Sequence, residues 1–156
     1  MRLSRFNLIV AAFAGVAVAS PLHAEPVAPD AVKFEDGTVA ISLTGAPGNA
    51  EEGASVFKNR KLGNCLACHA NSDQENELFH GEVGPPLDGV GSRWEEGEIR
   101  AIVVNSKQVF GEETVMPGFY SLDVGKNVRE DLVGKTILTA EQVEDVVAYL
   151  TTLKDE

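Results

Sequence analysis

Two cysteines and one histidine fall within one short stretch of the chain, Cys65-Leu66-Ala67-Cys68-His69. The pattern C-x-x-C-H is the attachment motif of c-type haem. Its spacing lets the two thiols form thioethers with the two vinyl groups of the porphyrin, while the adjacent imidazole coordinates the iron. The motif therefore predicts one covalently bound haem c, attached through Cys65 and Cys68 and ligated by His69.

Two other interpretations of these residues are weaker. A thioredoxin-like dithiol requires a βαβ unit around the motif, and the flanking sequence predicts none. A structural zinc site requires four nitrogen or sulfur ligands. Residues 25–156 contain only four Cys and His residues in total, and one of them is the distant His80.

Met116 is the predicted second axial ligand of the iron. It is the only methionine after residue 24, and it precedes Pro117 in a stretch without a helical pattern. Haem proteins of this kind use methionine for a high reduction potential or histidine for a lower one. A lone methionine is more often a core residue, and ligation by His80, or an exchange between the two, remains an open alternative.

Residues 84–87, Gly-Pro-Pro-Leu, follow the motif closely enough to support it. A metal-bound histidine normally donates its other ring N–H to a carbonyl or carboxylate, which fixes the tautomer. We assign that carbonyl to Pro85, with an ordinary turn as the alternative. Leu87 and Trp94 are expected to pack on the haem and Arg93 to pair with a propionate, although each fits an ordinary core or surface position equally well.

The elements that must position these residues are helices and long loops. Asn49 is predicted to cap a helix that runs to about residue 60, and a second helix is expected from residue 94 to about 105. Thr139 and Gln142 form a capping box before a last helix with an apolar stripe. About three helices leave a thin core, which indicates a large apolar prosthetic group between them.

Residues 1–24 have the pattern of a cleaved signal peptide. Arg2 and Arg5 precede an apolar run over residues 8–19, and Leu-His-Ala ends at Ala24. The run is shorter than the ~20 residues that span a bilayer, so an uncleaved anchor is disfavoured. We expect cleavage near Ala24, or alternatively after Ala19, and export to the periplasm.

The length of 156 residues suits a single domain, and the net charge is −11. Residues 1–24 hold two basic and no acidic residues, so the chain without them carries a charge of −13. This charge disfavours nucleic acid and anionic membranes as partners. The predicted organisation is a signal peptide (1–24), an extended N-terminal arm (25–47) and one haem domain (48–156).

The order of these features resembles a class I cytochrome c: a helix, the haem motif, Gly-Pro-x-Leu, a Met-Pro loop and a final helix containing Tyr149. The surrounding sequence is similar to the SoxX family, the mono-haem subunits of SoxAX sulfur-oxidation cytochromes. The matching segments are residues 59–64, 84–87, 93–94, 100–104, 116–117, 134–139 and 143–145. The resemblance covers nearly all of residues 45–153.

The resemblance implies an all-α, class I cytochrome c-like fold with about three main helices around one haem and a long distal loop. It implies that Cys65 and Cys68 bind the haem and that His69 and Met116 are its axial ligands. It also implies a function. SoxAX cytochromes act as L-cysteine S-thiosulfotransferases, which join thiosulfate oxidatively to a cysteine of the SoxYZ carrier protein. The SoxA partner is catalytic, and the SoxX subunit passes the electrons to a small acceptor cytochrome.

The residues themselves agree with an electron-transfer role within a heterodimer. An iron ligated by both histidine and methionine has no position open for a substrate, and the chain has no spare cysteine to act as a nucleophile. The chain alone is therefore expected to be inactive on thiosulfate. A free periplasmic class I cytochrome c that only shuttles electrons is the alternative, and a haem-based sensor would require a labile sixth ligand.

Two segments are expected to meet partners. Lys58, Arg60 and Lys61 form a basic run near the haem motif, although a solvated helix end would look the same. The loop over residues 106–135 is expected to expose apolar side chains to the catalytic partner. Its apolar residues are Val109, Phe110, Phe119, Tyr120, Leu122 and Val124.

Overall fold

The computed structural model describes residues 25–123 and 125–155. The predicted signal peptide and Val124 lie outside the described residues. Within them the regular structure is helical, and the one β-bridge joins Glu35 and Thr38. The α-helices are α1 (Ala50–Lys58), α2 (Val90–Arg93), α3 (Glu96–Phe110) and α4 (Ala140–Thr152). Short 3-10 helices cover Pro29–Ala31, Cys65–Ala67, Ser72–Gln74 and Glu130–Leu132. The prediction of an all-α chain is confirmed.

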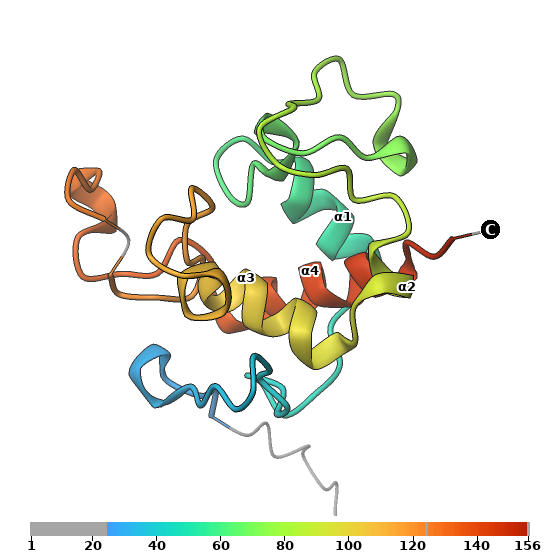
Figure 1. Ribbon diagram of the computed structural model, residues 1–156. Coiled ribbons are helices and arrows are strands. Elements are labelled where there is room, and N and C mark those ends of the chain that lie inside the picture. The colour runs from blue at the N-terminus through green and yellow to red at the C-terminus, as the bar shows by residue number, and fades with distance from the viewer. Residues whose placement is uncertain (1–24, 124, 156) are drawn as a thin grey trace, which may run out of the picture.

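Helix α4 is the centre of the fold and packs against α1, α2 and α3 (Figure 1). Its crossing with α1 is close because Gly53 has no side chain: a Cβ there would lie 1.9 Å from the carbonyl oxygen of Asp145. Beside it, the rings of Phe57 and Tyr149 meet edge to face with centroids 5.4 Å apart. The first and last helices of the haem domain therefore cross in direct contact.

The helix starts follow the capping residues. The Asn49 side chain accepts hydrogen bonds from the backbone N–H of Glu51 and Glu52, which satisfies two donors of the first turn of α1. The predicted capping box of Thr139 and Gln142 is present at the start of α4. These two expectations from the sequence are confirmed.

Helix α3 differs from its prediction at both ends. It begins at Glu96, behind a capping box formed by Glu95 and Glu98, and continues to Phe110 with a kink at Asn105 (φ −157°, ψ 93°). Asn105 interrupts the helix, as its weak helix propensity suggests. Its side chain then accepts a hydrogen bond from Lys107 N at 3.2 Å, and the helix resumes. The loop expected to begin at residue 106 therefore begins at Gly111.

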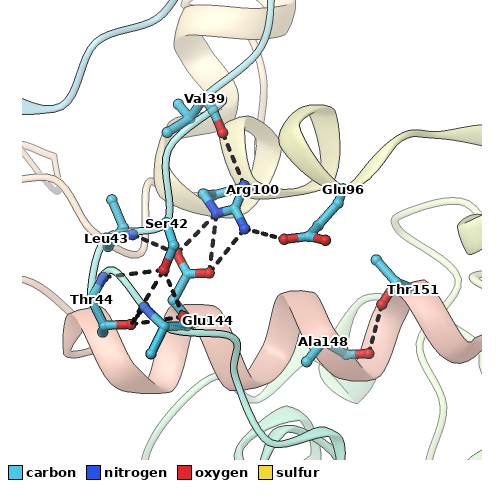
Figure 2. A network of polar contacts seen from close by, with 10 residues as sticks. Val39, Ser42, Leu43, Thr44, Glu96, Arg100, Glu144, Ala148 and Thr151 are labelled. Atoms are coloured by element: carbon cyan, nitrogen blue, oxygen red, sulfur yellow. Dashed lines mark hydrogen bonds and ion pairs between the residues drawn. The ribbon is translucent and has the colours of Figure 1, made fainter. Parts of the chain in front are cut away.

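The N-terminal arm, residues 25–47, lies along α3 and α4 on the side away from the haem-motif loop (blue in Figure 1). It is held by a buried ion pair in which Arg100 Nε lies 2.9 Å from Glu144 Oε1, with both side chains only 3% exposed. Glu144 also accepts from Leu43 N at 2.8 Å, and Arg100 donates to the Val39 carbonyl at 3.0 Å (Figure 2). The pair thus joins α3, α4 and the arm.

The core consists of apolar side chains mainly from the helices, together with Val39 and Leu43 from the arm and Phe119, Tyr120 and Leu138 from the loop between α3 and α4. Among the described residues, no helix is long and apolar enough to cross a membrane.

Candidate haem site

A cavity of about 630 Å³ opens between the haem motif and the loop that follows α3. Its volume lies in the range of about 300–1,000 Å³ that is usual for sites of bound organic molecules. Cys65, Cys68, His69 and Met116 all line it. Most of the remaining lining is apolar and comes from the four α-helices and the loops: Phe57, Leu62, Leu87, Val90, Ile99, Ile102, Val103, Phe119, Ile137, Leu138, Val146 and Leu150.

The haem motif is fixed mainly by hydrogen bonds within its own neighbourhood. Cys65–Ala67 form a 3-10 helix, and His69 N donates to the Cys65 carbonyl at 2.9 Å. The following loop returns to the motif, where Gly81 N donates to Leu66 O and Gly84 N donates to Cys68 O, both at 2.8 Å. The two thiols and the imidazole are thereby presented on one short, closed segment.

His69 has the hydrogen bond predicted for a haem ligand. Its Nδ1 lies 2.7 Å from the Pro85 carbonyl oxygen. Because a carbonyl can only accept, Nδ1 carries the proton and Nε2 keeps its lone pair for a metal. Gly84 makes this approach possible, since a Cβ there would lie 2.4 Å from the imidazole Cε1.

The donor set and its surroundings fit a covalent haem c. Cys65 and Cys68 are not joined in a disulfide, and burial raises the pKa of the Cys65 thiol to about 12. A site that holds sulfur in a neutral form suits thioethers, which carry no charge. Among the described residues, no three or more His, Cys, Asp or Glu side chains gather as a metal-binding group, so the zinc interpretation finds no ligand set there.

His80, the alternative sixth ligand, is placed elsewhere. It does not line the cavity. Its Nδ1 accepts from Asn71 N at 3.2 Å, and its Nε2 donates to the Gln74 carbonyl at 3.1 Å. Both ring nitrogens are therefore used inside the loop, whereas Met116 lines the cavity.

The remaining predicted residues fall into two groups. Pro85 and Leu87 line the cavity. Arg93 does not, and its guanidinium donates to the carbonyls of Pro86 at 3.1 Å and Asp88 at 2.5 Å, so its pairing with a propionate stays a prediction. Trp94 also lies away from the cavity lining and meets Phe110 edge to face, with centroids 6.1 Å apart.

A buried polar network beside the motif was not predicted from the sequence. The Tyr149 hydroxyl on α4 donates to Asp73 at 2.7 Å and accepts from Asn71 at 2.8 Å and Gln74 at 3.1 Å. Burial, together with the Asp73 carboxylate, raises the pKa of Tyr149 to about 12. Asn71, with no exposed surface, also donates its N–H to His80. A tyrosine on the core face of the last helix was the only sequence signal of this link.

The mouth of the cavity combines cations with exposed apolar side chains. Arg60, Lys61 and Arg129 are exposed and line it. Three exposed apolar residues line it as well: Val83, Phe110 and Val115. Lys58, expected to belong to the same basic group, instead pairs with Glu77 at 3.0 Å. Of the apolar residues in the loop expected to meet the partner, Phe110 and Leu122 are exposed, whereas Phe119 and Tyr120 are buried.

Comparisons with known proteins place this site in a family. The cytochrome c family model matches residues 50–154. A chain of the crystal structure of SoxXA from P. pantotrophus is 45% identical, with a TM-score of 0.77 over 83% of this chain and 99% of that one. No curated protein matches the sequence.

Two further solved structures are less similar. The c-type cytochrome SorU from Sinorhizobium meliloti is 27% identical over 67% of this chain and 90% of that one, with a TM-score of 0.44. Cytochrome c2 from Paracoccus denitrificans is 17% identical over 69% of this chain and 97% of that one, with a TM-score of 0.37. With TM-scores this low, neither structure assigns a property to this chain.

The family match and the SoxXA likeness confirm the class I cytochrome c fold predicted from the sequence. They also confirm a covalently bound haem c as the cofactor. The chain therefore belongs to the cytochrome c family, and within it to the SoxX type that its sequence motifs resemble.

Proposed function

We propose that this chain is the electron-transfer subunit of a SoxAX-type L-cysteine S-thiosulfotransferase. Cys65 and Cys68 hold the haem through thioethers, and His69 and Met116 are its axial ligands. The observation that carries the proposal is that both thiols, the imidazole and the only methionine after residue 24 line one and the same apolar cavity. Bound haem c supplies one-electron redox chemistry at this place.

The residues around the cavity prepare it for electron transfer. Pro85 holds the His69 tautomer that leaves Nε2 free for the iron. The Met116 thioether favours the reduced state and so raises the reduction potential. Because both axial positions are then filled by the protein, a substrate cannot coordinate, and the chain acts by passing electrons.

The catalytic step belongs to a partner. In the proposed reaction, a carrier cysteine thiolate and thiosulfate form one S–S bond and release two electrons. A SoxA-like subunit catalyses this step, and the present chain accepts the electrons and passes them to a small acceptor cytochrome. The 45% identity to a chain of SoxXA supports this heterodimer. Cleavage of residues 1–24 near Ala24 would place the haem domain, residues 48–156, and its arm in the periplasm.

The cavity mouth is the proposed docking surface. Arg60 and Lys61 place positive charge there in a chain of net charge −11, whereas Arg129 pairs with Asp131 at 2.6 Å. Charge steers the encounter of proteins and makes its rate depend on salt. Charge reversal of Arg60 and Lys61 should therefore slow electron transfer to or from a partner and flatten its salt dependence. Unchanged rates at every ionic strength would place the docking surface elsewhere.

The ligands are tested by the variant Met116→Ala. We expect loss of the weak sulfur-to-iron charge-transfer band of the ferric protein and a lower reduction potential, because the thioether that favours ferrous iron is gone. His80→Ala is the matched control and should leave both unchanged. A changed spectrum and potential in His80→Ala, with both unchanged in Met116→Ala, would assign the sixth position to His80.

The enzyme role is tested by reconstitution. The purified chain should undergo redox cycling but show no thiosulfate-dependent turnover, and addition of a SoxA subunit and the SoxYZ carrier should restore turnover. Size-exclusion chromatography should show a heterodimer. A chain that stays monomeric with both partners present would instead be a free electron carrier, and thiosulfate oxidation by the chain alone would overturn the assignment.

A further inference from the structure

The kink in α3 makes backbone carbonyls available to the loop that carries Met116. A continuous helix would use the Val103 and Val104 carbonyls for its own i to i+4 bonds. Here they accept from Phe119 N and Tyr120 N instead, both at 3.1 Å. The kink at Asn105 thus anchors the loop directly after Met116-Pro117-Gly118.

The helical turn after the kink binds the part of the loop that leads up to Met116. Ser106, which has no exposed surface, donates its hydroxyl to the Met116 carbonyl at 2.7 Å. The Lys107 ammonium donates to the carbonyls of Thr114 at 2.6 Å and Glu112 at 3.2 Å. Three main-chain carbonyls from Glu112 to Met116 are therefore bound by two adjacent side chains of α3.

The loop also packs closely against Asn105 at Gly118. A Cβ at Gly118 would lie 3.0 Å from Asn105 Oδ1. The same Asn105 oxygen accepts from Lys107 N, so the side chain that terminates the first part of α3 also abuts the loop. A movement of the loop that withdraws Met116 from the cavity would have to break these contacts together.

We propose that Asn105, Ser106 and Lys107 form a clamp that holds Met116 in the cavity, and that Ser106 and Lys107 set how readily Met116 leaves the iron. The proposal rests on the proposed ligation of the iron by Met116. Ser106 and Lys107 are positioning residues, because they act on the main chain of the loop and not on the cofactor. The clamp is what makes the site an electron carrier with a closed sixth position, as opposed to a sensor that opens to ligands.

The test uses imidazole as a probe of the ferric holoprotein. Imidazole binds the iron only when Met116 has left, so its apparent affinity measures how often the clamp opens. Loss of one hydrogen bond of ordinary strength, about 1 kcal/mol, corresponds to about a fivefold change. We expect Ser106→Ala to bind imidazole about fivefold more tightly than the native protein, and Lys107→Met to bind at least as tightly as Ser106→Ala.

Matched controls separate the clamp from general effects of the substitutions. Ser121→Ala removes a hydroxyl of the same loop, which donates to Asp123 O at 3.4 Å and accepts from Asp123 N at 3.2 Å and contacts no residue of the clamp by a hydrogen bond. Lys126→Met removes an exposed ammonium further along the loop. Both should keep the native imidazole affinity, and Lys107→Arg, which retains donors, should lie closer to native than Lys107→Met. Lys107 is half-buried, so its variants test the clamp even where Ser106→Ala lowers folding yield.

Native imidazole affinity in both Ser106→Ala and Lys107→Met, with the charge-transfer band intact, would overturn the clamp alone. A native protein that lacks the band and is unaffected by Met116→Ala would overturn the ligation itself, and the clamp with it. The two failures are thus distinguishable in the same set of spectra.

Discussion

The two sides of the haem cavity are built in different ways. The side that carries the haem motif, residues 62–87, is held mainly by bonds within itself, such as those of Gly81 N, Gly84 N and His69 Nδ1. The side that carries Met116, residues 111–138, is held from α3, through the freed carbonyls at the kink and the side chains of Ser106 and Lys107. A thioether motif needs local geometry, whereas a ligand from a distant loop needs an external support.

The first prediction tests how α3, the support of the Met116 side, is held against α4. Glu144→Ala removes one partner of the buried pair between α3 and α4 and leaves the buried Arg100 with only the exposed carboxylate of Glu96 as an ionic partner. We expect a loss of about 3–5 kcal/mol in the free energy of unfolding, measured by urea denaturation of the holoprotein. Glu141→Ala, at an exposed position of the same helix, should change it little. An equal loss of unfolding free energy in Glu144→Ala and Glu141→Ala would show that the buried pair does not hold α3 against α4.

The second prediction breaks the motif side alone. In Gly84→Ala the new methyl would meet the His69 ring at 2.4 Å, and overpacking of this kind costs about 1–3 kcal/mol. We expect lower stability together with a changed ferric spectrum, because the imidazole must move. Gly97→Ala places its Cβ at an ordinary 3.4 Å from its nearest neighbour and is the control. A native spectrum in Gly84→Ala would contradict the packing.

The third prediction concerns the hydrogen bonds of Tyr149, which link the motif side to α4. Tyr149→Phe keeps the ring contact with Phe57 but loses the three hydrogen bonds of the hydroxyl. We expect a loss of about 1–2 kcal/mol near neutral pH. Tyr120→Phe, which loses one bond to Val27 O at 2.8 Å, should lose about half as much.

The difference in stability between the native protein and Tyr149→Phe is predicted to depend on pH. The pKa of Tyr149 is about 12 in the native state, whereas a phenol in an unfolded chain titrates near 10. Above about pH 10 the unfolded state therefore binds fewer protons than the native state, and the native protein loses stability as the pH rises towards 12. The difference between the native protein and Tyr149→Phe should shrink over this interval. A constant difference would mean that the hydroxyl is not held protonated.

The smallest expected effect is that of the ion pair between Lys58 and Glu77, which connects α1 to the motif loop at the surface. Both side chains are about 40% exposed (43% and 41%), and such pairs contribute about 0–1 kcal/mol. Lys58→Gln should therefore move the unfolding midpoint only slightly, and less in high salt. If Lys58→Gln lost as much unfolding free energy as Tyr149→Phe, the surface ion pair would be an important support of the motif side.

Sequence patterns were informative wherever neighbouring residues decide the structure. The caps at Asn49 and Thr139 act on backbone groups two or three residues away, and the turn at Pro85 reaches His69 over a short loop. The end of α3 was mispredicted because its continuation beyond Asn105 is supported by bonds to a loop that comes later in the chain. No periodicity in residues 106–110 carries that information.

The sequence by itself determined the cofactor chemistry of this protein: C-x-x-C-H specifies a covalent haem, and Met116, the only methionine after residue 24, and the Gly-Pro turn are the groups that we propose to complete its site. Only the tertiary structure decided how those groups are held. The support of Met116 by α3, the Tyr149 network and the pairing of Arg100 with Glu144 join residues that are distant in the chain. Long-range contacts of this kind depend on which faces meet when the helices pack, and a linear pattern does not encode that choice.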